Sequence, residues 1–239
     1  MIEFLGVGIP DEHGGWLLHR VCARLERSGL VALVTARTDT GRAFLDALAG
    51  RHIPIEGRVW VDRIPLMRDT AARVRGLVTE AGPSVRFTEY RSVLWNTLVT
   101  PRAALTGLLR FPRPGQRAAA IRALSAVKLD ARWRDPVGSL TSFERARLAL
   151  ACALARRPRA LILRDVDATL GPEDAAALLR LVRGLAHVER FVVVASVSAS
   201  LARACADRVI VIADGLLVFD GPALVFNDAA NHRLRGVVG

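Results

Sequence analysis

The segment 35–43 has the position of a phosphate-binding loop. It follows the apolar run Leu30–Val34, which predicts a buried strand, and precedes Phe44–Ala49, which predicts a helix. Loops of this kind hold phosphate through backbone N–H groups and the positive end of the helix, with several glycines and one lysine. Here the loop has one glycine, Gly41, and the chain's single lysine, Lys128, lies far away. The frame of a phosphate site is present, and its usual chemistry is missing.

Two registers are open for this loop. If the loop is one residue shorter than usual, Arg42 takes the place of the lysine, although its wide planar guanidinium suits a tight loop poorly. Otherwise Gly41 occupies that place and no cation is present. Ala43 offers no hydroxyl to Mg²⁺, and Asp39 adds a negative charge that repels phosphate. The candidate nucleotide positions in this segment are Thr35, Thr40, Gly41, Arg42 and Ala43.

Other residue types indicate no second site. Asp165 and Asp167 follow a short apolar run, and we interpret Asp167 as a loop cap. The five histidines have no metal-ligand or triad spacing, so no metal site is expected, and the four tryptophans do not interleave with basic clusters. The three cysteines lie far apart in apolar stretches, where we expect buried, reduced thiols. They are Cys22, Cys152 and Cys205.

Length and composition limit the architecture. The 239 residues, 51% of them hydrophobic, suffice for one sizeable α/β domain, with or without a small insert. No stretch of about 18 uncharged apolar residues predicts a transmembrane helix. The N-terminus lacks a basic region followed by an apolar one, so we expect no signal peptide.

The chain is strongly basic. Its formal net charge is +11, and 33 of the 34 Lys and Arg residues are arginine. The arginines are dispersed, with no run of five, which favours a compositional bias that also suits an anionic membrane surface over nucleic-acid binding.

Apolar periodicity and turn residues predict the elements that position these residues. Strands alternating with helices predict a mostly parallel sheet with helices on both faces. A helical region is expected from Ser92 to about Trp133, broken at 111–115. Strands are predicted at Glu3–Ile9, Val21–Leu25, Leu30–Val34, Arg58–Val61, Val74–Thr79, Ala160–Leu163, Phe191–Ala195, Val209–Ala213 and Leu216–Phe219. Further helices are predicted at Gly41–Leu48, Ser142–Arg156, Pro172–Leu185 and Ala199–Ala206.

The second half of the chain resembles the ATP-binding subunits of ABC transporters. Leu140–Leu154 has the layout of the signature helix, and Pro158–Val166 has that of the Walker B strand with its catalytic carboxylate. Val192–Ser198 is similar to the switch-histidine strand, and Ala206–Gly215 to the closing hairpin. The resemblance rests on order and spacing and covers nearly the whole chain. Within the family the middle stretch, including Asn96–Leu98 and 108–113, is most similar to phosphonate-import ATPases.

This resemblance implies the fold and the partners. The fold would be an α/β ABC-type nucleotide-binding domain with a P-loop-like parallel sheet core, N-terminal antiparallel strands and an inserted helical subdomain. Residues 1–79 and 158–239 would form the core, and about 80–157 the Q-loop, helical insert and signature helix. ATP and Mg²⁺ would be the cofactors. The partners would be transmembrane permease subunits and a second ABC subunit, in a homodimer or a heterodimer, at the inner face of the cell membrane.

The family's ATP and Mg²⁺ positions are mostly substituted. Arg164 stands at the Walker B aspartate, and Glu80 at the glutamine that senses Mg²⁺ and the transporter. Asp165 stands at the catalytic glutamate and is one methylene shorter, while Val197 replaces the switch histidine. The resemblance therefore implies a site that has lost much of its chemistry.

The signature is also altered. In this family it completes the ATP site of the partner subunit in a head-to-tail dimer, through a Ser-Gly-Gly segment. This chain has Thr141-Ser142-Phe143 there, and the ring of Phe143 fills space that a glycine leaves open. Glu144 and Arg147 follow on the same helix.

Our main hypothesis is a pseudo-ATPase that serves as a structural or regulatory subunit of a membrane import complex. The subunit would be cytoplasmic and peripheral on the membrane, and the complex would import a phosphonate-type ligand. Its helical insert would contact the permease near Arg91, Trp95 and Asn96. One alternative is an active ATPase that uses Arg42, Asp165 and Glu80. The other alternative is a basic, nucleic-acid-associated protein with the ABC fold. This hypothesis is weaker, because the sequence has one nucleotide-domain unit and no basic tail.

Overall fold

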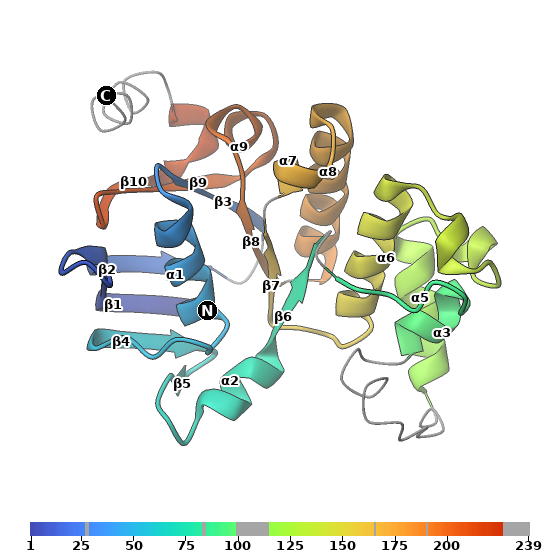
Figure 1. Cartoon of the computed structure of the whole chain (residues 1–239), viewed down its shortest axis with the longest axis horizontal. Coiled ribbons are helices and arrows are strands. Elements are labelled where there is room, and N and C mark those ends of the chain that lie inside the picture. Colours follow the sequence, from blue (N-terminus) through green and yellow to red (C-terminus); the bar gives the residue numbers. More distant parts are fainter. Residues whose placement is uncertain (27–28, 83–84, 99–114, 165, 190, 227–239) are drawn as a thin grey trace.

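The computed structural model describes residues 1–26, 29–82, 85–98, 115–164, 166–189 and 191–226. Two sheets form its frame (Figure 1). The smaller sheet is antiparallel, in the order β2 (Trp16–Leu25), β1 (Ile2–Pro10), β4 (Glu56–Val61) and β5 (Ile64–Pro65). The larger has the order β10 (Leu216–Pro222), β9 (Arg208–Ala213), β3 (Gly29–Thr35), β8 (Val192–Ser196), β7 (Ala160–Leu163) and β6 (Val78–Ala81).

Only β10 runs antiparallel in the larger sheet. The other strands pair in parallel, as the alternation of strands and helices predicts. β9 and β10 form a hairpin whose turn residues, Asp214 and Gly215, both have positive φ. This is the backbone that an Asp-Gly turn favours, so the sequence signal for the hairpin is confirmed.

The larger sheet separates two hydrophobic cores. In β3, Leu30 and Ala32 face one core, while Val31 and Leu33 face the other. This burial on both faces explains why the parallel strands read as continuous apolar runs. The second core lies between the sheets and contains α1 (Thr38–Leu48), whose Phe44 stacks on Phe4 at 4.3 Å between ring centroids.

Helices cover the opposite face of the larger sheet (Figure 1). These are α6 (Ser142–Leu154), α8 (Pro172–Glu189) and α9 (Ala199–Cys205), with the short α7 (Val166–Thr169) leading into α8. Beyond α6 lie α3 (Val93–Leu98) and α5 (Gln116–Ala126), followed by the single turns η1 (Asp130–Arg132) and η2 (Val137–Ser139); a third, η3 (Ala223–Val225), follows β10. The predicted 111–115 break and the 108–113 stretch lie largely outside the described residues.

Several predicted boundaries were wrong: β2 begins five residues before the expected Val21, and two further errors affect the region of the site. Val74–Thr79 was expected as a strand, but α2 (Ala71–Leu77) precedes the short β6. Val74 is fully buried on one side of this helix, and Arg75 donates to the carbonyl of Gly50. Apolar residues three or four apart fit one helical turn as well as a strand, so periodicity alone did not decide between them. The second error, the start of α1, changes the candidate site and is described with it.

No helix in the described ranges is long and apolar enough to cross a membrane. Within the same ranges, no group of three or more His, Cys, Asp or Glu residues could hold a metal ion.

Candidate functional site

The junction of β3 and α1 is shorter than the sequence suggests. Only Ala36 and Arg37 separate the strand from a helix that begins at Thr38, three residues before the expected start at Gly41. The amide N–H of Gly41 donates to the carbonyl of Arg37 at 3.3 Å. Part of the predicted phosphate loop is therefore wound into a helix, where Asp39 lies in the first turn.

Gly41 has a packing role in this arrangement. A Cβ at Gly41 would lie 2.9 Å from Oγ1 of Thr35, at the end of β3. Real Cβ contacts are essentially never this short, so a side chain at position 41 would force either the Thr35 side chain or α1 to shift. Thr40 and Ala43, on either side, are buried. The glycine thus permits close contact between helix and strand.

The two arginines of this segment are held by neighbouring carboxylates. Arg42 lies on the exposed side of α1, where its side chain is 63% exposed and 3.4 Å from the carboxylate of Asp39. Arg37 donates to Asp11 at 2.8 Å, and this hydrogen bond holds the pKa of Asp11 below its ordinary value. Asp11 thereby fixes the residue before α1.

Four charged side chains meet at the carboxyl ends of β6 and β7; we call Asp46, Arg51, Glu80 and Arg164 the charge cluster. Arg164, just after β7, donates to Glu80 on β6 and to Asp46 on α1, the latter at 2.5 Å. Arg51 donates to the other oxygen of Glu80 and lies 3.5 Å from Asp46. The cluster thereby joins α1 and the turn after it to two strands of the larger sheet.

Glu80 is ionised in this cluster. Burial alone would raise its pKa, but the hydrogen bonds from Arg51 and Arg164 outweigh that effect and lower the pKa below its ordinary value. The Arg164 side chain is 18% exposed, and that of Glu80 is 25% exposed, so their attraction is only partly screened by water. Arg164 therefore serves as a fixed cation between two carboxylates.

The described charges at this end balance one another. Four arginines here lie beside four carboxylates, so the formal charges of these eight side chains sum to 4 − 4 = 0. The Arg164 guanidinium lies between Glu80 and Asp46, and Val197, expected at the switch position, is buried and apolar. Asp165, expected at the catalytic position, lies outside the described residues. The residues concerned are Arg37, Arg42, Arg51, Arg164, Asp11, Asp39, Asp46 and Glu80.

The amino end of α6 is closed by its own side chains. Thr141 caps the helix by accepting from the amide of Glu144, and the Glu144 carboxylate accepts from the amide of Thr141. Arg132 donates to both oxygens of Glu144, at 2.9 and 2.8 Å. The Thr141 bond, then Arg132, lowers the pKa of Glu144 against the opposing effect of burial. The Thr141 hydroxyl is thus an acceptor inside this chain, and it caps its own helix.

Phe143 and Arg147 form the next layer on α6. The Arg147 guanidinium lies 5.0 Å from the centre of the Phe143 ring and donates to the carbonyls of Val127 and Lys128. These contacts tie the signature helix to the end of α5. Ser142 lies exposed between them.

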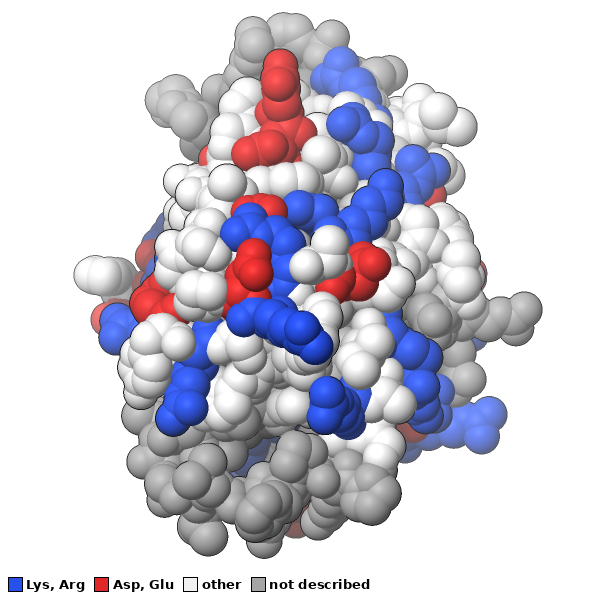
Figure 2. Space-filling view, turned by 90° about the vertical axis from the view of Figure 1, so that its right-hand side faces the viewer, with Lys and Arg blue, Asp and Glu red and all other residues white. Residues whose placement is uncertain are grey.

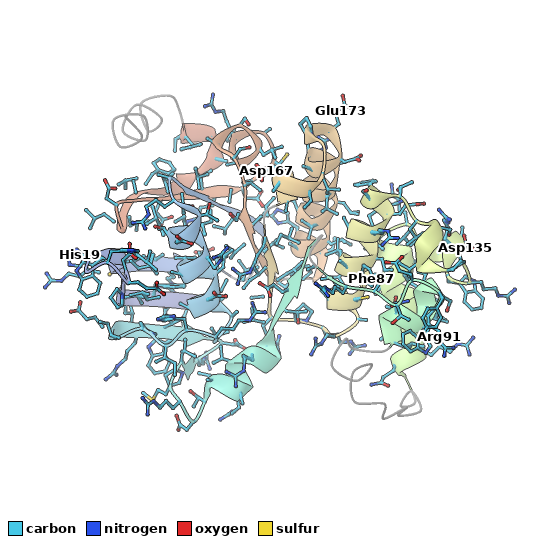
Figure 3. All side chains as sticks on the ribbon, in the orientation of Figure 1. His19, Phe87, Arg91, Asp135, Asp167 and Glu173 are labelled. Atoms are coloured by element: carbon cyan, nitrogen blue, oxygen red, sulfur yellow. The ribbon has the colours of Figure 1, made fainter. Side chains whose placement is uncertain are left out.

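The structure separates the other candidate residues from these two places. Asp167 (labelled in Figure 3) was expected to cap a loop, but it lies in α7 and accepts from the amide of Ser198, the residue before α9. Cys205 is buried as expected, but Cys22 is exposed, because its strand turns that side chain outward. Burial raises the pKa of the Cys152 thiol to about 12, so this cysteine is a poor nucleophile at neutral pH.

A cavity of about 740 Å³ lies beside the charge cluster, between β6, α3 and α6. Glu80 belongs to both, since it also lines this larger cavity. Phe87, Trp95 and Leu98 give the walls apolar surface, while Arg86 and Arg156 add positive charge. Figure 3 labels Phe87, in the connection between β6 and α3, and Arg91, close to α3.

Comparison with known proteins gives the family. No family model matches the sequence. The chain is 31% identical over 242 residues to the phosphonates import ATP-binding protein PhnC 2 of Rhodopseudomonas palustris, covering 98% of this chain and 84% of that protein. It is 32% identical over 212 residues to PhnC 1 of Natronomonas pharaonis, covering 86% and 87%. The chain belongs to the ATP-binding subunits of ABC transporters.

Solved structures share the fold of this ABC subunit. CbiO1 of Clostridium perfringens, part of the ABC transporter complex cbiONQ, aligns with a TM-score of 0.82 at 18% identity, over 97% of this chain and 92% of its own. The ATP-binding cassette MJ1267 aligns with a TM-score of 0.87 at 13% identity, over 100% and 98%. The predicted ABC-type α/β fold, with its N-terminal antiparallel strands, is therefore confirmed.

Sequence reasoning missed half of the charge cluster in this ABC subunit. It selected Arg164 and Glu80 separately, from family positions, but not Asp46 or Arg51. Asp46 lies on a helix and Arg51 in the turn after it, both in ordinary surroundings for charged residues. The available signal was the opposite charge of two substitutions at positions that share one site.

Proposed function

We propose that this ABC subunit no longer hydrolyses ATP and serves as a structural or regulatory subunit of a membrane import complex, on the cytoplasmic side. The observation that carries this proposal is the pairing of Arg164 with Glu80. The two substitutions compensate each other's charge, and together they place a guanidinium where a metal ion would have to bind. A site kept for hydrolysis has no reason to hold this pair.

The signature region supports the same proposal. Its Glu144 carboxylate is bound within the chain, and Phe143 carries the Arg147 guanidinium on its ring. In a head-to-tail dimer the Phe143 ring would fill space that close approach to a γ-phosphate on a partner requires. The dimer partner we propose, identical or a second ABC subunit, would therefore gain a scaffold from this chain and little catalytic help.

The larger cavity is the place we propose for a permease segment. Its apolar walls and its two arginines suit an amphipathic segment that carries acidic residues. Next to it Arg91 lies over the rings of Tyr90 and Trp95, at 5.5 and 5.4 Å from their centres. Arginine and aromatic side chains of this kind often dominate the binding energy of an interface.

Asn96 has a positioning role in this proposal. It is buried, and its amide group bonds the backbone of Thr88, Arg91 and Ser92. These bonds hold the turn that presents Arg91. Asn96 therefore supports the docking surface from behind. The relatives named above are phosphonate importers, and a phosphonate-type ligand for the complex is the corresponding finer proposal.

The decisive experiment is calorimetric titration of the purified chain with Mg²⁺-ATP, followed by a hydrolysis assay with its permease. We expect no binding heat up to about 1 mM nucleotide, which bounds the binding free energy near −4 kcal/mol. An Arg164→Asp, Glu80→Gln variant, which lacks the Arg164–Glu80 ion pair, is titrated in the same way as the matched control. Micromolar binding together with hydrolysis that Asp165→Asn abolishes would contradict the proposal.

Docking is tested separately by co-purification with the permease subunits. Trp95→Ala should lower recovery about tenfold or more, as expected for a loss of 1.4 kcal/mol or more at a central aromatic residue. Leu224→Ala is the control, because that apolar side chain is 99% exposed at the other end of the chain. Equal recovery of both variants would remove the larger cavity from the interface.

A further inference from the structure

A smaller cavity of about 380 Å³ lies at the opposite end of the larger sheet from the charge cluster. Pro158 and Arg159 line it just before β7, and Phe191 lines it just before β8, so it sits at the amino ends of these strands. The charge cluster lies at the carboxyl ends. The two places share no residue.

Three arginines from two segments, α5 and the connection between α6 and β7, line the smaller cavity. Arg122 comes from α5, Arg157 follows α6, and Arg159 precedes β7. None of its described lining residues is acidic. Arg157 has φ +53°, a backbone conformation that glycine adopts more easily, so the guanidinium is placed here at a cost in backbone energy.

These arginines are poorly compensated. Arg159 lies 3.5 Å from Asp62, with its side chain 64% exposed, which makes a weak pair. Within the described ranges, Arg122 and Arg157 form no ion pair and no side-chain hydrogen bond. Three arginines against one carboxylate leave a charge of 3 − 1 = +2 at this cavity. In the charge cluster, by contrast, every guanidinium has its carboxylate.

Part of the lining is apolar. Leu154, Leu185 and Phe191 contribute side chains, of which Phe191 is only 4% exposed. Figure 2, which shows the face that includes α5 and α6, has arginines spread over much of the surface, many of them beside acidic residues. Uncompensated arginines around an apolar floor are a different arrangement from these surface pairs.

We propose that the smaller cavity binds a small amphipathic oxyanion: a carboxylate or phosphate joined to an aromatic or short aliphatic group. The planar forks of the arginines match either head group with two parallel hydrogen bonds. The apolar floor accepts the remainder of the ligand, and the volume lies in the range of small-molecule sites. Binding at this site does not rest on the proposed function, since no lining residue belongs to the charge cluster or the larger cavity; only the effector role described next rests on it.

Both cavities use the end of α6. Ala153 and Arg156 line the larger cavity, while Leu154 and Arg157 line the smaller one. A ligand in the smaller cavity thus contacts the same helix end that faces the proposed permease segment, which gives it a route to act as an effector.

The test is titration of the full chain with phenyl phosphate and with benzoate, followed by calorimetry or NMR. Inorganic phosphate and benzamide separate the contributions of the charge and the ring. We expect saturable binding of at least one of the two charged aromatic probes, stronger than that of inorganic phosphate or benzamide. The preferred probe identifies the head group. An Arg122→Ala, Arg157→Ala variant should bind about tenfold or more weakly.

Arg180→Ala is the matched control for the loss of one exposed guanidinium on α8, and it should bind like the unchanged chain. Circular dichroism and thermal melting establish that each variant is folded. Three results would overturn the proposal: no saturable binding of either charged probe below about 10 mM, equal binding by benzamide, or equal weakening by Arg180→Ala. Leu185→Ala gives a second readout, since it should weaken both aromatic probes and leave inorganic phosphate unchanged.

Discussion

Arginine–carboxylate ion pairs occur both at the carboxyl end of the larger sheet and at the amino end of α6, but the paired residues are separated by very different distances in the sequence. In the charge cluster, Arg164 reaches Asp46 across 118 positions and Glu80 across 84. At α6, Arg132 reaches Glu144 across 12 positions, and Thr141 reaches the same residue across three. The first arrangement holds separate elements together. The second completes one helix and the turn before it, so the same kind of pair has a different structural weight in each region.

The largest effect should come from Arg164→Ala. It leaves Glu80 and Asp46 with only Arg51, in surroundings where each carboxylate is about three-quarters buried. We expect a loss of about 3 kcal/mol in the free energy of unfolding, measured by urea denaturation. Arg164→Lys keeps the charge but cannot bridge both carboxylates, so its free energy of unfolding should lie between those of Arg164→Ala and the unchanged protein. A loss below about 1 kcal/mol would mean that the cluster behaves like an ordinary surface pair.

Glu80→Gln should cost less, on the order of 2 kcal/mol at pH 7, because the shape is kept and only the charge is lost. The effect depends on pH. Since the folded-state pKa of Glu80 lies below its ordinary value of 4.5, its stabilisation is present above that value and is lost as pH falls through the lower folded-state pKa. Urea denaturation of both proteins at pH 7 and near pH 3 should show the difference shrinking in acid. A difference that stays constant would show that charge plays no part.

Thr141→Ala tests the local region and should cost about 1 kcal/mol, the usual value of a helix N-cap. Its hydroxyl satisfies the amide of Glu144 at 3.2 Å, and an alanine leaves that amide without its partner. Thr141→Ser keeps the hydroxyl, so its stability should be close to that of the unchanged protein. Thermal melting of both variants measures the difference. If the alanine variant matched the charge-cluster variants in cost, the contrast between the two regions would fail.

The smallest effect belongs to the exposed pair of Arg145 and Glu89. Its two bonds are short, 2.7 and 2.6 Å, but the side chains are 35% and 53% exposed. Arg145→Ala should cost about 0.5 kcal/mol or less, and the cost should shrink further in 0.5 M salt. A larger, salt-insensitive loss in urea denaturation would show that geometry outweighs exposure in this chain.

Elements with a strong local signal were predicted well from the sequence. The apolar run of β7 was placed at its observed limits, and the Asp214-Gly215 turn identified the closing hairpin. α2 was missed because its apolar spacing fits a strand or a helix, and tertiary burial of Val74 decided between them. The early start of α1 was missed because glycine at 41 was interpreted as phosphate chemistry, whereas it is needed where the helix meets Thr35.

The candidate site was less predictable, because its contacts join residues that are distant in the sequence. Family positions pointed to Arg164 and Glu80 one at a time. Their pairing requires β6 and β7 to be neighbours in the sheet, and the contribution of Asp46 requires α1 to lie across their ends. These are properties of the fold, and no local sequence pattern around Asp46 or Arg51 predicts them.

The strand β3 presents alternate side chains to both hydrophobic cores, and β8 on one side and β9 on the other do the same. Because the same strands contribute to both cores, one core cannot unfold while the other stays folded. Unfolding of the described part should be a single cooperative transition, and amide protons in β3 and β8 should be the slowest to exchange with deuterium, at the free energy of global unfolding. The interleaved packing of β3, β8 and β9 thus makes the two cores one folding unit.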